Sequence, residues 1–174
     1  MRKSFPCLVF VVVYVIFALL QSDKFLTMAN MKTIVQQSSV MAIVAVGMLF
    51  VIILGEVDLS VSSIMGLAGF ICADLAREHV LLAVGAGILT GTVVGLMNGI
   101  ICTCLKIPSM IVTVGMHMVL VGVMRIYSES RSIHFNQGMK SFGKFPRLFL
   151  VLAAVLVICH FLLKHSLFGR CCIA

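Results

Sequence analysis

Charged residues are scarce in this sequence, and tryptophan is absent. Of the 174 residues, 11% are Asp, Glu, Lys or Arg and 61% are hydrophobic, so the mean hydropathy reaches +1.20. A soluble domain covers its surface with charged and polar side chains, and these are too few to cover a chain of this length. The composition therefore excludes an ordinary soluble domain.

The sequence also lacks the short motifs that carry enzyme chemistry. It has no GxxxxGK[ST] phosphate loop, no HExxH or GxSxG motif, and no paired carboxylates at helical spacing inside an apolar run. Its 7 cysteines show no CxxC or Cys/His ligand spacing, and most lie in apolar runs, where a thiol behaves as a small hydrophobic group. We therefore expect no catalytic residue, no metal site and no cofactor.

The net charge of +7 does not by itself indicate nucleic acid. The 13 Lys and Arg residues are scattered singly or in pairs, and they form no basic stripe with interleaved aromatic residues. Phospholipid headgroups are a simpler partner for such scattered charges. We therefore expect the chain to contact a lipid bilayer and no nucleic acid.

Long apolar runs separated by short polar clusters are abundant. Because a run of roughly 20 apolar residues is the length of a bilayer-spanning helix, we predict an all-α polytopic membrane protein of about six transmembrane helices. We expect one transmembrane domain over residues 1–174, with spans at 5–22, 34–54, 61–76, 80–105, 110–127 and 148–163. The first run could instead be a signal peptide, but no small-x-small cleavage site follows it, which favours a helix.

Positive charge does not decide the orientation of these spans. With the N-terminus in the cytoplasm, 5 Lys and Arg residues lie inside and 8 lie outside. This distribution runs against the positive-inside rule. The charge count alone would therefore place the N-terminus on the opposite side of the membrane, outside the cytoplasm.

One polar segment, GEVDLSVSS at residues 55–63, interrupts the apolar pattern. Carboxylates at membrane depth are expensive and usually functional, and a helix break can line a substrate path with its free amides facing the ligand. Glu56, Asp58 and Ser60 are therefore candidates for such a path. The alternative is a short aqueous loop in which Asp58 or Ser60 caps the next helix.

The predicted span 80–105 carries a glycine at every fourth position over part of its length. Such small residues let another helix approach closely, and we predict a packing role for Gly87, Gly91, Gly95 and Gly99. Asn98 lies beside this series and has two possible roles, a hydrogen bond to a neighbouring helix or one to a hydroxyl group of a solute. His117 is alone in an apolar run and is expected to be a packing residue.

Three further motifs follow residues 55–63 in order along the chain. They are Asn98-Gly99, LKIPSMIVTVGM at residues 105–116, and Phe168-Gly169-Arg170 with Ala174. The four segments resemble GGIDLSVGS, NG, LKIPPFIVTLGT and FGRYIYA of the permease subunits of bacterial ABC importers of the ribose, simple-sugar and autoinducer-2 type. The matching order and spacing are specific to this family, although not to one solute.

The resemblance implies a subunit that forms half of a homo- or heterodimeric pore in the bacterial inner (cytoplasmic) membrane. It implies three protein partners: a cytoplasmic ABC ATPase that uses the ATP, a second permease subunit, and a periplasmic solute-binding protein. It also implies that the N-terminus is cytoplasmic and that Phe168, Gly169 and Arg170 face the ATPase. The transported molecule would be a simple sugar or a sugar-like solute.

Several positions depart from the resembled motifs. Glu56 replaces a glycine, adding charge and removing backbone freedom at the tightest point of the motif, while Ser62 replaces another glycine and Met116 a threonine. Members of the family are expected to be about twice this length. We therefore expect a truncated, N-terminal half of a permease.

The expected truncation leaves two alternatives. The first is a gene remnant or split-gene product that inserts into the membrane without transporting, which a neighbouring reading frame with the remaining helices would favour. The second is a small ion-coupled carrier with Asp58 and Glu56 as proton sites. Uptake by such a carrier would be abolished by an uncoupler and independent of any ATPase.

Overall fold

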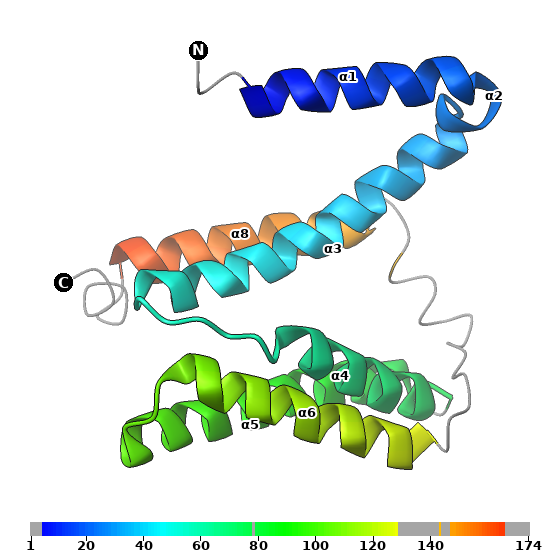
Figure 1. Cartoon of the computed structure of the whole chain (residues 1–174). Helices are drawn as coiled ribbons and strands as arrows, with labels where there is room; N and C mark the ends of the chain where they lie inside the picture. Colours follow the sequence, from blue (N-terminus) through cyan, green and yellow to red (C-terminus); the bar gives the residue numbers. More distant parts are fainter. Residues whose placement is uncertain (1–4, 78, 129–142, 144–146, 166–174) are drawn as a thin grey trace.

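The computed structural model describes residues 5–77, 79–128, 143 and 147–165. All regular structure in these ranges is helical, as the sequence predicts. Figure 1 shows the elements, which are α1 (Phe5–Leu20), α2 (Ser22–Phe25), α3 (Met28–Ile53), α4 (Val61–Leu75), α5 (Val80–Leu105), α6 (Ser109–Ser128) and α8 (Arg147–His165). Each predicted apolar segment overlaps one of these helices.

The largest difference from the predicted boundaries is at the start of α3, expected at residue 34 and found at Met28. Thr27 caps this helix, because its Oγ1 accepts a hydrogen bond from the amide of Asn30 at 3.2 Å. The first turns of α3 contain Asn30, Lys32 and Thr33, so the start of the apolar run does not mark where the helix begins.

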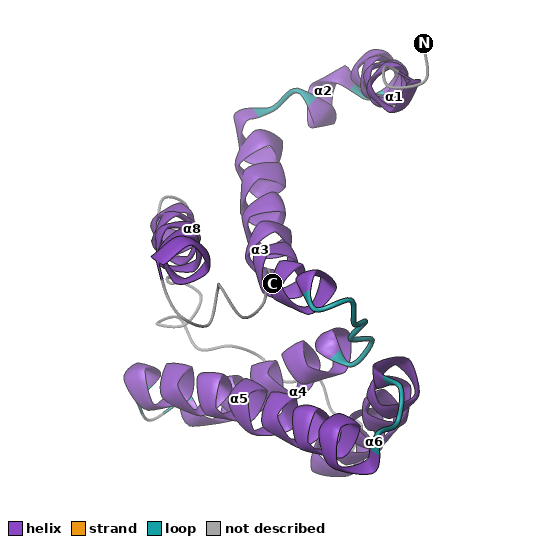
Figure 2. Cartoon of the chain, turned by 90° about the vertical axis from the view of Figure 1, so that its left-hand side faces the viewer, coloured by secondary structure: helices purple, strands orange, loops and turns teal. Residues whose placement is uncertain are grey.

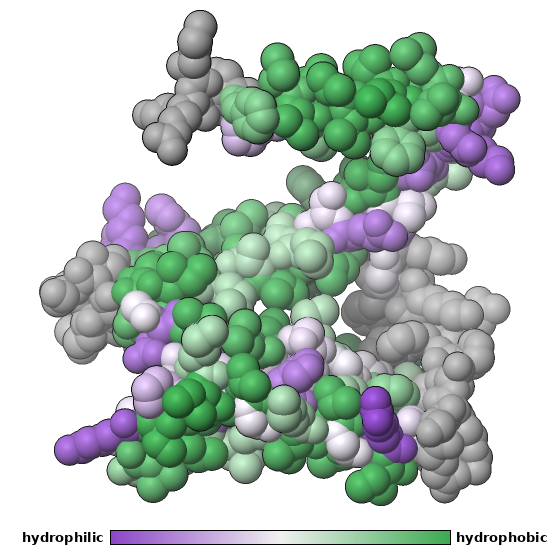
Figure 3. All heavy atoms as spheres, viewed as in Figure 1, coloured by the Kyte–Doolittle hydropathy of each residue, from purple (hydrophilic) through white to green (hydrophobic). Residues whose placement is uncertain are grey.

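Within the described ranges, four helices, α3, α5, α6 and α8, are long and apolar enough to cross a membrane by length and composition. α1 and α4 are apolar but have only 16 and 15 residues, so their crossing remains a prediction. Figure 3 shows hydrophobic side chains over the bodies of the helices, and many large apolar residues are exposed. Such a surface is stable in lipid, and the chain is a polytopic helical membrane protein.

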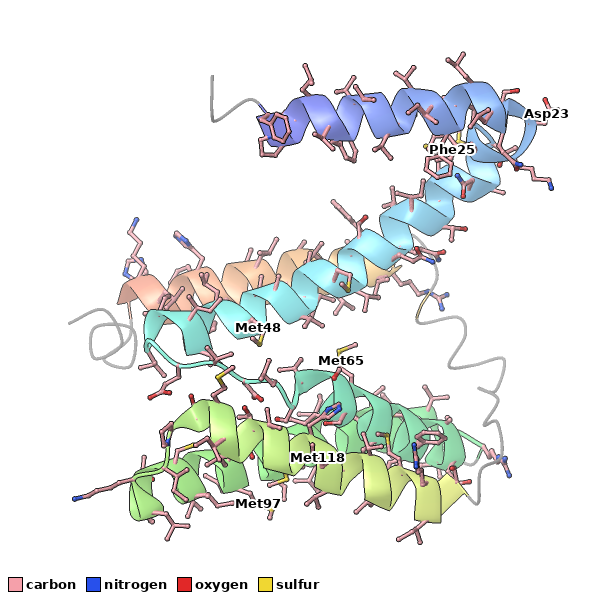
Figure 4. The ribbon with its side chains drawn as sticks, viewed as in Figure 1. Asp23, Phe25, Met48, Met65, Met97 and Met118 are labelled. Atoms are coloured by element: carbon pink, nitrogen blue, oxygen red, sulfur yellow. The ribbon has the colours of Figure 1, made fainter. Side chains whose placement is uncertain are left out.

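The helices pack in three groups (Figures 1 and 2). α4, α5 and α6 pack against one another, α3 lies along α8, and α1 packs against α2. The ring of Phe25 stacks on Phe17 of α1 with a centroid distance of 5.9 Å, and Tyr14 meets it edge-on at 5.2 Å. In Figure 4, Phe25 lies beside the turn between α1 and α2, so this aromatic cluster fixes that turn.

Within the three-helix unit, α4 and α6 run in the same direction and α5 runs in the opposite one. Ser109 at the start of α6 contacts the segment that precedes α4, whereas the Tyr127 hydroxyl near its end donates to Asp74 Oδ2 of α4 at 2.9 Å. Each helix contributes one residue to a buried hydrophobic cluster of Leu67, Val94 and Leu120. The start of α6 and the break before α4 therefore lie at the same end of the unit.

The glycines of α5 contact α4 over only part of the predicted series. A Cβ atom at Gly87 would lie 2.5 Å from Cys72 Sγ, and one at Gly91 would meet α4 at 3.8 Å. At Gly95 and Gly99 a Cβ atom would meet nothing within 4 Å. A helix turns by about 100° per residue, so two residues four positions apart differ by about 40° around the helix axis. A series of such residues therefore does not stay on one face. A packing role for Gly95 and Gly99 thus stays a prediction.

Candidate functional site

The non-helical segment between α3 and α4, called the break below, begins at Gly55, whose backbone has a left-handed conformation. Gly55 has a φ of 75°, its amide donates to Ile52 O at 2.9 Å, and the amide of Glu56 donates to Val51 O at 3.1 Å. This Schellman pairing satisfies carbonyl groups at the end of α3, and glycine adopts the required φ without a Cβ clash. The break is therefore encoded locally, by the glycine that opens the GEVDLSVSS segment.

Asp58 and Asn98 meet at the side chain of Ser60. Asp58 Oδ1 accepts hydrogen bonds from the Ser60 amide at 2.8 Å and from Ser60 Oγ at 2.6 Å. Ser60 Oγ in turn accepts a hydrogen bond from Asn98 Nδ2 at 2.9 Å. Ser60 is 0% exposed and Asn98 is 6% exposed. A buried chain of hydrogen bonds thus joins the carboxylate in the break to the body of α5.

This arrangement differs from a simple helix cap. Ser60 occupies the N-cap position of α4, but its side chain makes no capping hydrogen bond, because the hydroxyl is engaged by Asp58 and Asn98. Asp58 binds the amide of Ser60 itself and not one in the first turn of the helix. Of the two roles open to Asn98, the structure shows the contact with a neighbouring element.

α6 holds the same segment from another side. Ser109 Oγ accepts a hydrogen bond from the Val57 amide at 3.3 Å and donates one to the Glu56 carboxylate. Thr113 Oγ1 donates to the carbonyl of Val57 at 3.4 Å. The site therefore combines the break with side chains of α5 and α6. The local sequence gives no sign of the roles of Ser109 and Thr113, since their partners lie 52 to 56 residues away.

Two buried side-chain atoms among the described residues have no hydrogen-bond partner: Asn98 Oδ1 and His117 Nδ1. An unsatisfied buried polar atom costs roughly 1–3 kcal/mol. Asn98 therefore contributes one satisfied group to the site and one free acceptor. His117 is half-buried on α6 and lies outside the network around Ser60.

Substitution of Asn98 tests whether its hydrogen bond to Ser60 stabilises the fold by more than its unsatisfied acceptor destabilises it. Asn98→Leu removes the bond to Ser60 and the free acceptor together and keeps the number and branching of the side-chain heavy atoms, so we expect the free energy of unfolding to change by less than about 1 kcal/mol. Asn98→Ala also leaves a cavity and is expected to lose about 1–3 kcal/mol. Thermal unfolding in detergent compares the two. If both variants lost the same free energy of unfolding, the hydrogen bond to Ser60 would stabilise the fold by more than the unsatisfied Oδ1 atom destabilises it.

The described residues include no group of three or more His, Cys, Asp and Glu side chains that could hold a metal ion. The carboxylates of Glu56 and Asp58 both accept hydrogen bonds from serine hydroxyls. The arrangement can therefore position polar groups in a helix break. Phe168, Gly169 and Arg170, predicted to face an ATPase, lie outside the described residues.

The segments that form this site belong to a part of the chain that matches a known protein family. Residues 30–174, from α3 onward, match the family described as the permease component of the branched-chain amino acid transport system. The chain belongs to this permease family. The match includes the break, the glycine-bearing α5 and α6, and it leaves α1 and α2 outside.

Several permeases are similar to this chain. The ribose import permease protein of Escherichia coli strain K12 is 32% identical over 161 residues, which cover 86% of this chain and 50% of that protein. The L-arabinose ABC transporter permease protein of Azospirillum brasilense is 33% identical over 177 residues, covering 97% and 52%. An inner membrane ABC transporter permease protein of Escherichia coli strain K12 is 28% identical over 186 residues, covering 97% and 56%.

These matches confirm the resemblance to sugar ABC permeases that the four motifs indicated. The chain spans about half the length of the curated relatives it matches. No solved structure matches it significantly. The family consists of transport proteins and is not a class of enzymes.

Proposed function

We propose that this chain is a transmembrane permease subunit of an ABC importer for a simple sugar or a sugar-like solute. The observation that carries the proposal is its similarity to ribose and L-arabinose permeases over 86% and 97% of its length. In this role the chain catalyses no reaction and binds no nucleotide, because ATP is used by a separate subunit. Its place would be the bacterial inner membrane, as the name of one relative indicates.

The proposed function requires three protein partners. In this role a cytoplasmic ABC ATPase would supply the energy, as the resemblance to ABC importer permeases implies. A second permease polypeptide would complete the pore, and large apolar side chains on α5 and α8 are exposed where such helices could pack. A periplasmic binding protein would deliver the solute. Phe168, Gly169 and Arg170 would face the ATPase, as the resemblance implies.

Within this function, we assign the solute path to the polar break. Glu56, Asp58 and Ser60 lie where α3 ends and α4 begins, and Asn98 reaches them from α5. A solute rich in hydroxyl groups needs hydrogen-bond partners as it crosses the membrane. Polar groups at an interruption between apolar helices can provide them. Side chains of α5 and α6 both form hydrogen bonds with this segment. A movement of either helix would therefore shift the polar residues of the break.

A second candidate is a gene remnant or split-gene product that inserts into the membrane without transporting. The half-length match to the relatives is the observation that favours it. A remnant would be free to lose contacts that serve only transport, whereas the buried network around Ser60 is intact. The two candidates differ in whether partner subunits bind the chain.

Co-purification distinguishes these candidates. The tagged chain is produced in its native host, solubilised in mild detergent and purified, and we expect an ABC ATPase and a second permease polypeptide to accompany it. Arg170→Ala is expected to reduce the ATPase recovered at least about threefold, since Arg170 belongs to the motif resembling the cytoplasmic segment. Arg2→Ala, outside any motif, serves as the matched control. A lone or aggregated chain would overturn the permease proposal and favour the remnant.

A further inference from the structure

The hydroxyl of Ser109 makes two hydrogen bonds at once. It accepts from the amide of Val57 at 3.3 Å and donates to the carboxylate of Glu56. A serine hydroxyl has one proton and two lone pairs, so a single side chain can serve both partners. Ser109 therefore ties two consecutive residues of the break to the first turn of α6.

The backbone of Val57 is consequently held by α6 on both of its polar groups. Its amide binds Ser109, and its carbonyl accepts from Thr113 Oγ1 at 3.4 Å. Ser109 and Thr113 are four residues apart and so lie on the same side of the helix. The next residue is Asp58, whose carboxylate must meet both the amide and the hydroxyl of Ser60. Fixing Val57 thus limits where Asp58 can lie.

Both members of the contact depart from the resembled motifs. Glu56 stands where GGIDLSVGS has its second glycine, and Ser109 stands where LKIPPFIVTLGT has its second proline. Glycine has no carboxylate, and proline has neither a hydroxyl nor an amide proton. A chain with the motif residues could not form this contact. The two departures, 53 residues apart in sequence, therefore meet in one hydrogen bond.

We propose that Glu56 and Ser109 form a matched pair of positioning residues that hold the break against α6 and so keep Asp58 on Ser60. The pair is specific to chains that carry both residues. Its assignment to the solute path rests on the proposed function, but the contact itself can be tested without transport. The negative charge of Glu56 near the N-terminus of α6 also interacts favourably with the helix dipole.

A double-mutant cycle tests whether the two residues act together. Glu56→Gly and Ser109→Pro are each expected to lower the melting temperature of the full chain in detergent by about 2–4 °C. Proline fits the first position of a helix, so the backbone of α6 is retained. The double variant restores both motif residues and is expected to lose clearly less than the sum of the two.

A matched cycle uses another departure from the motif. Ser62 also replaces a glycine but lies in the first turn of α4, and the hydrogen bonds of the Ser109 hydroxyl go to Val57 and Glu56 instead. The effects of Ser62→Gly and Ser109→Pro are expected to add. If the Glu56 and Ser109 effects were equally additive, the two residues would not form a pair and the proposal would fail.

Hydrogen exchange of individual amides tests the positioning role. Ser109→Ala is expected to speed exchange about tenfold at the amide of Ser60, which binds Asp58 and is not touched by Ser109. Ser109→Thr keeps the hydroxyl and is expected to retain the slow exchange. Unchanged exchange at Ser60, or uniform acceleration over α3 and α8 as well, would overturn the positioning role. These readouts need no partner, so they remain informative even if the proposed transport function fails.

Discussion

Replacement of Gly87 by valine is expected to be among the most destabilising single changes in the chain. A Cβ atom at this position would lie only 2.5 Å from Cys72 Sγ, and valine adds two methyl groups beyond it. Cys72 is itself engaged, because its Sγ donates to the Ala83 carbonyl at 3.0 Å. Forcing α4 and α5 apart is expected to cost about 1–3 kcal/mol, measured as loss of the monodisperse, folded fraction after heating in detergent.

Gly95 provides the matched control on the same helix. A Cβ atom there meets nothing within 4 Å, so Gly95→Val is expected to leave stability within about 0.5 kcal/mol. Cys72→Ala removes the sulfur atom and is expected to recover part of the loss caused by Gly87→Val. Equal damage from Gly87→Val and Gly95→Val would show that the chain pairs with another helix at Gly95 or that α4 is not packed on Gly87.

Substitution of Asp58 is the second change with a large expected effect. Asp58→Ala removes the acceptor of two hydrogen bonds and leaves the amide and hydroxyl of fully buried Ser60 without that partner. Each loss of this kind costs about 1–3 kcal/mol, and we expect the melting temperature of the variant to fall by several degrees. Asp58→Asn keeps an oxygen that can accept both bonds, so most of the stability should be retained.

The comparison of these Asp58 variants also separates geometry from charge. In an assembled importer, uptake that survives Asp58→Asn but not Asp58→Ala would indicate that the hydrogen bonds are what the site requires. Loss of uptake in Asp58→Asn, with stability retained, would mean that the charge itself is needed. Full stability of Asp58→Ala would contradict the network described around Ser60.

The helices could be located from sequence because the bilayer sets their length. α5 begins at Val80 and ends at Leu105 as predicted, since a polar cluster precedes it and Pro108 prevents its continuation. The first turns of α3 were missed because they are polar and lie before the apolar run. Hydropathy also does not show which helices are neighbours, so the parallel course of α4 and α6 was not predicted.

The candidate site was only partly predictable for the same reason. Asp58, Ser60 and Asn98 were recognised as polar residues in unfavourable places, but nothing local indicates that all three meet. Ser109 carried no signal of its own, because a serine at the start of a helix is ordinary. Glu56 and Ser109 are two of several departures from the resembled motifs, and only the structure shows that these two are in contact.

The hydrogen bonds of the break also constrain the order in which the nascent protein matures. The amides of Gly55 and Glu56 bind carbonyl groups of α3, which exist as soon as that helix forms during translation. The acceptor for Val57 is Ser109, which the ribosome adds 52 residues later. Until then this amide must be satisfied by water or lipid headgroups. The bond between Val57 and α6 can therefore form only after Ser109 has been synthesised, so the hydrogen bonding of the break is completed later than that at the end of α3.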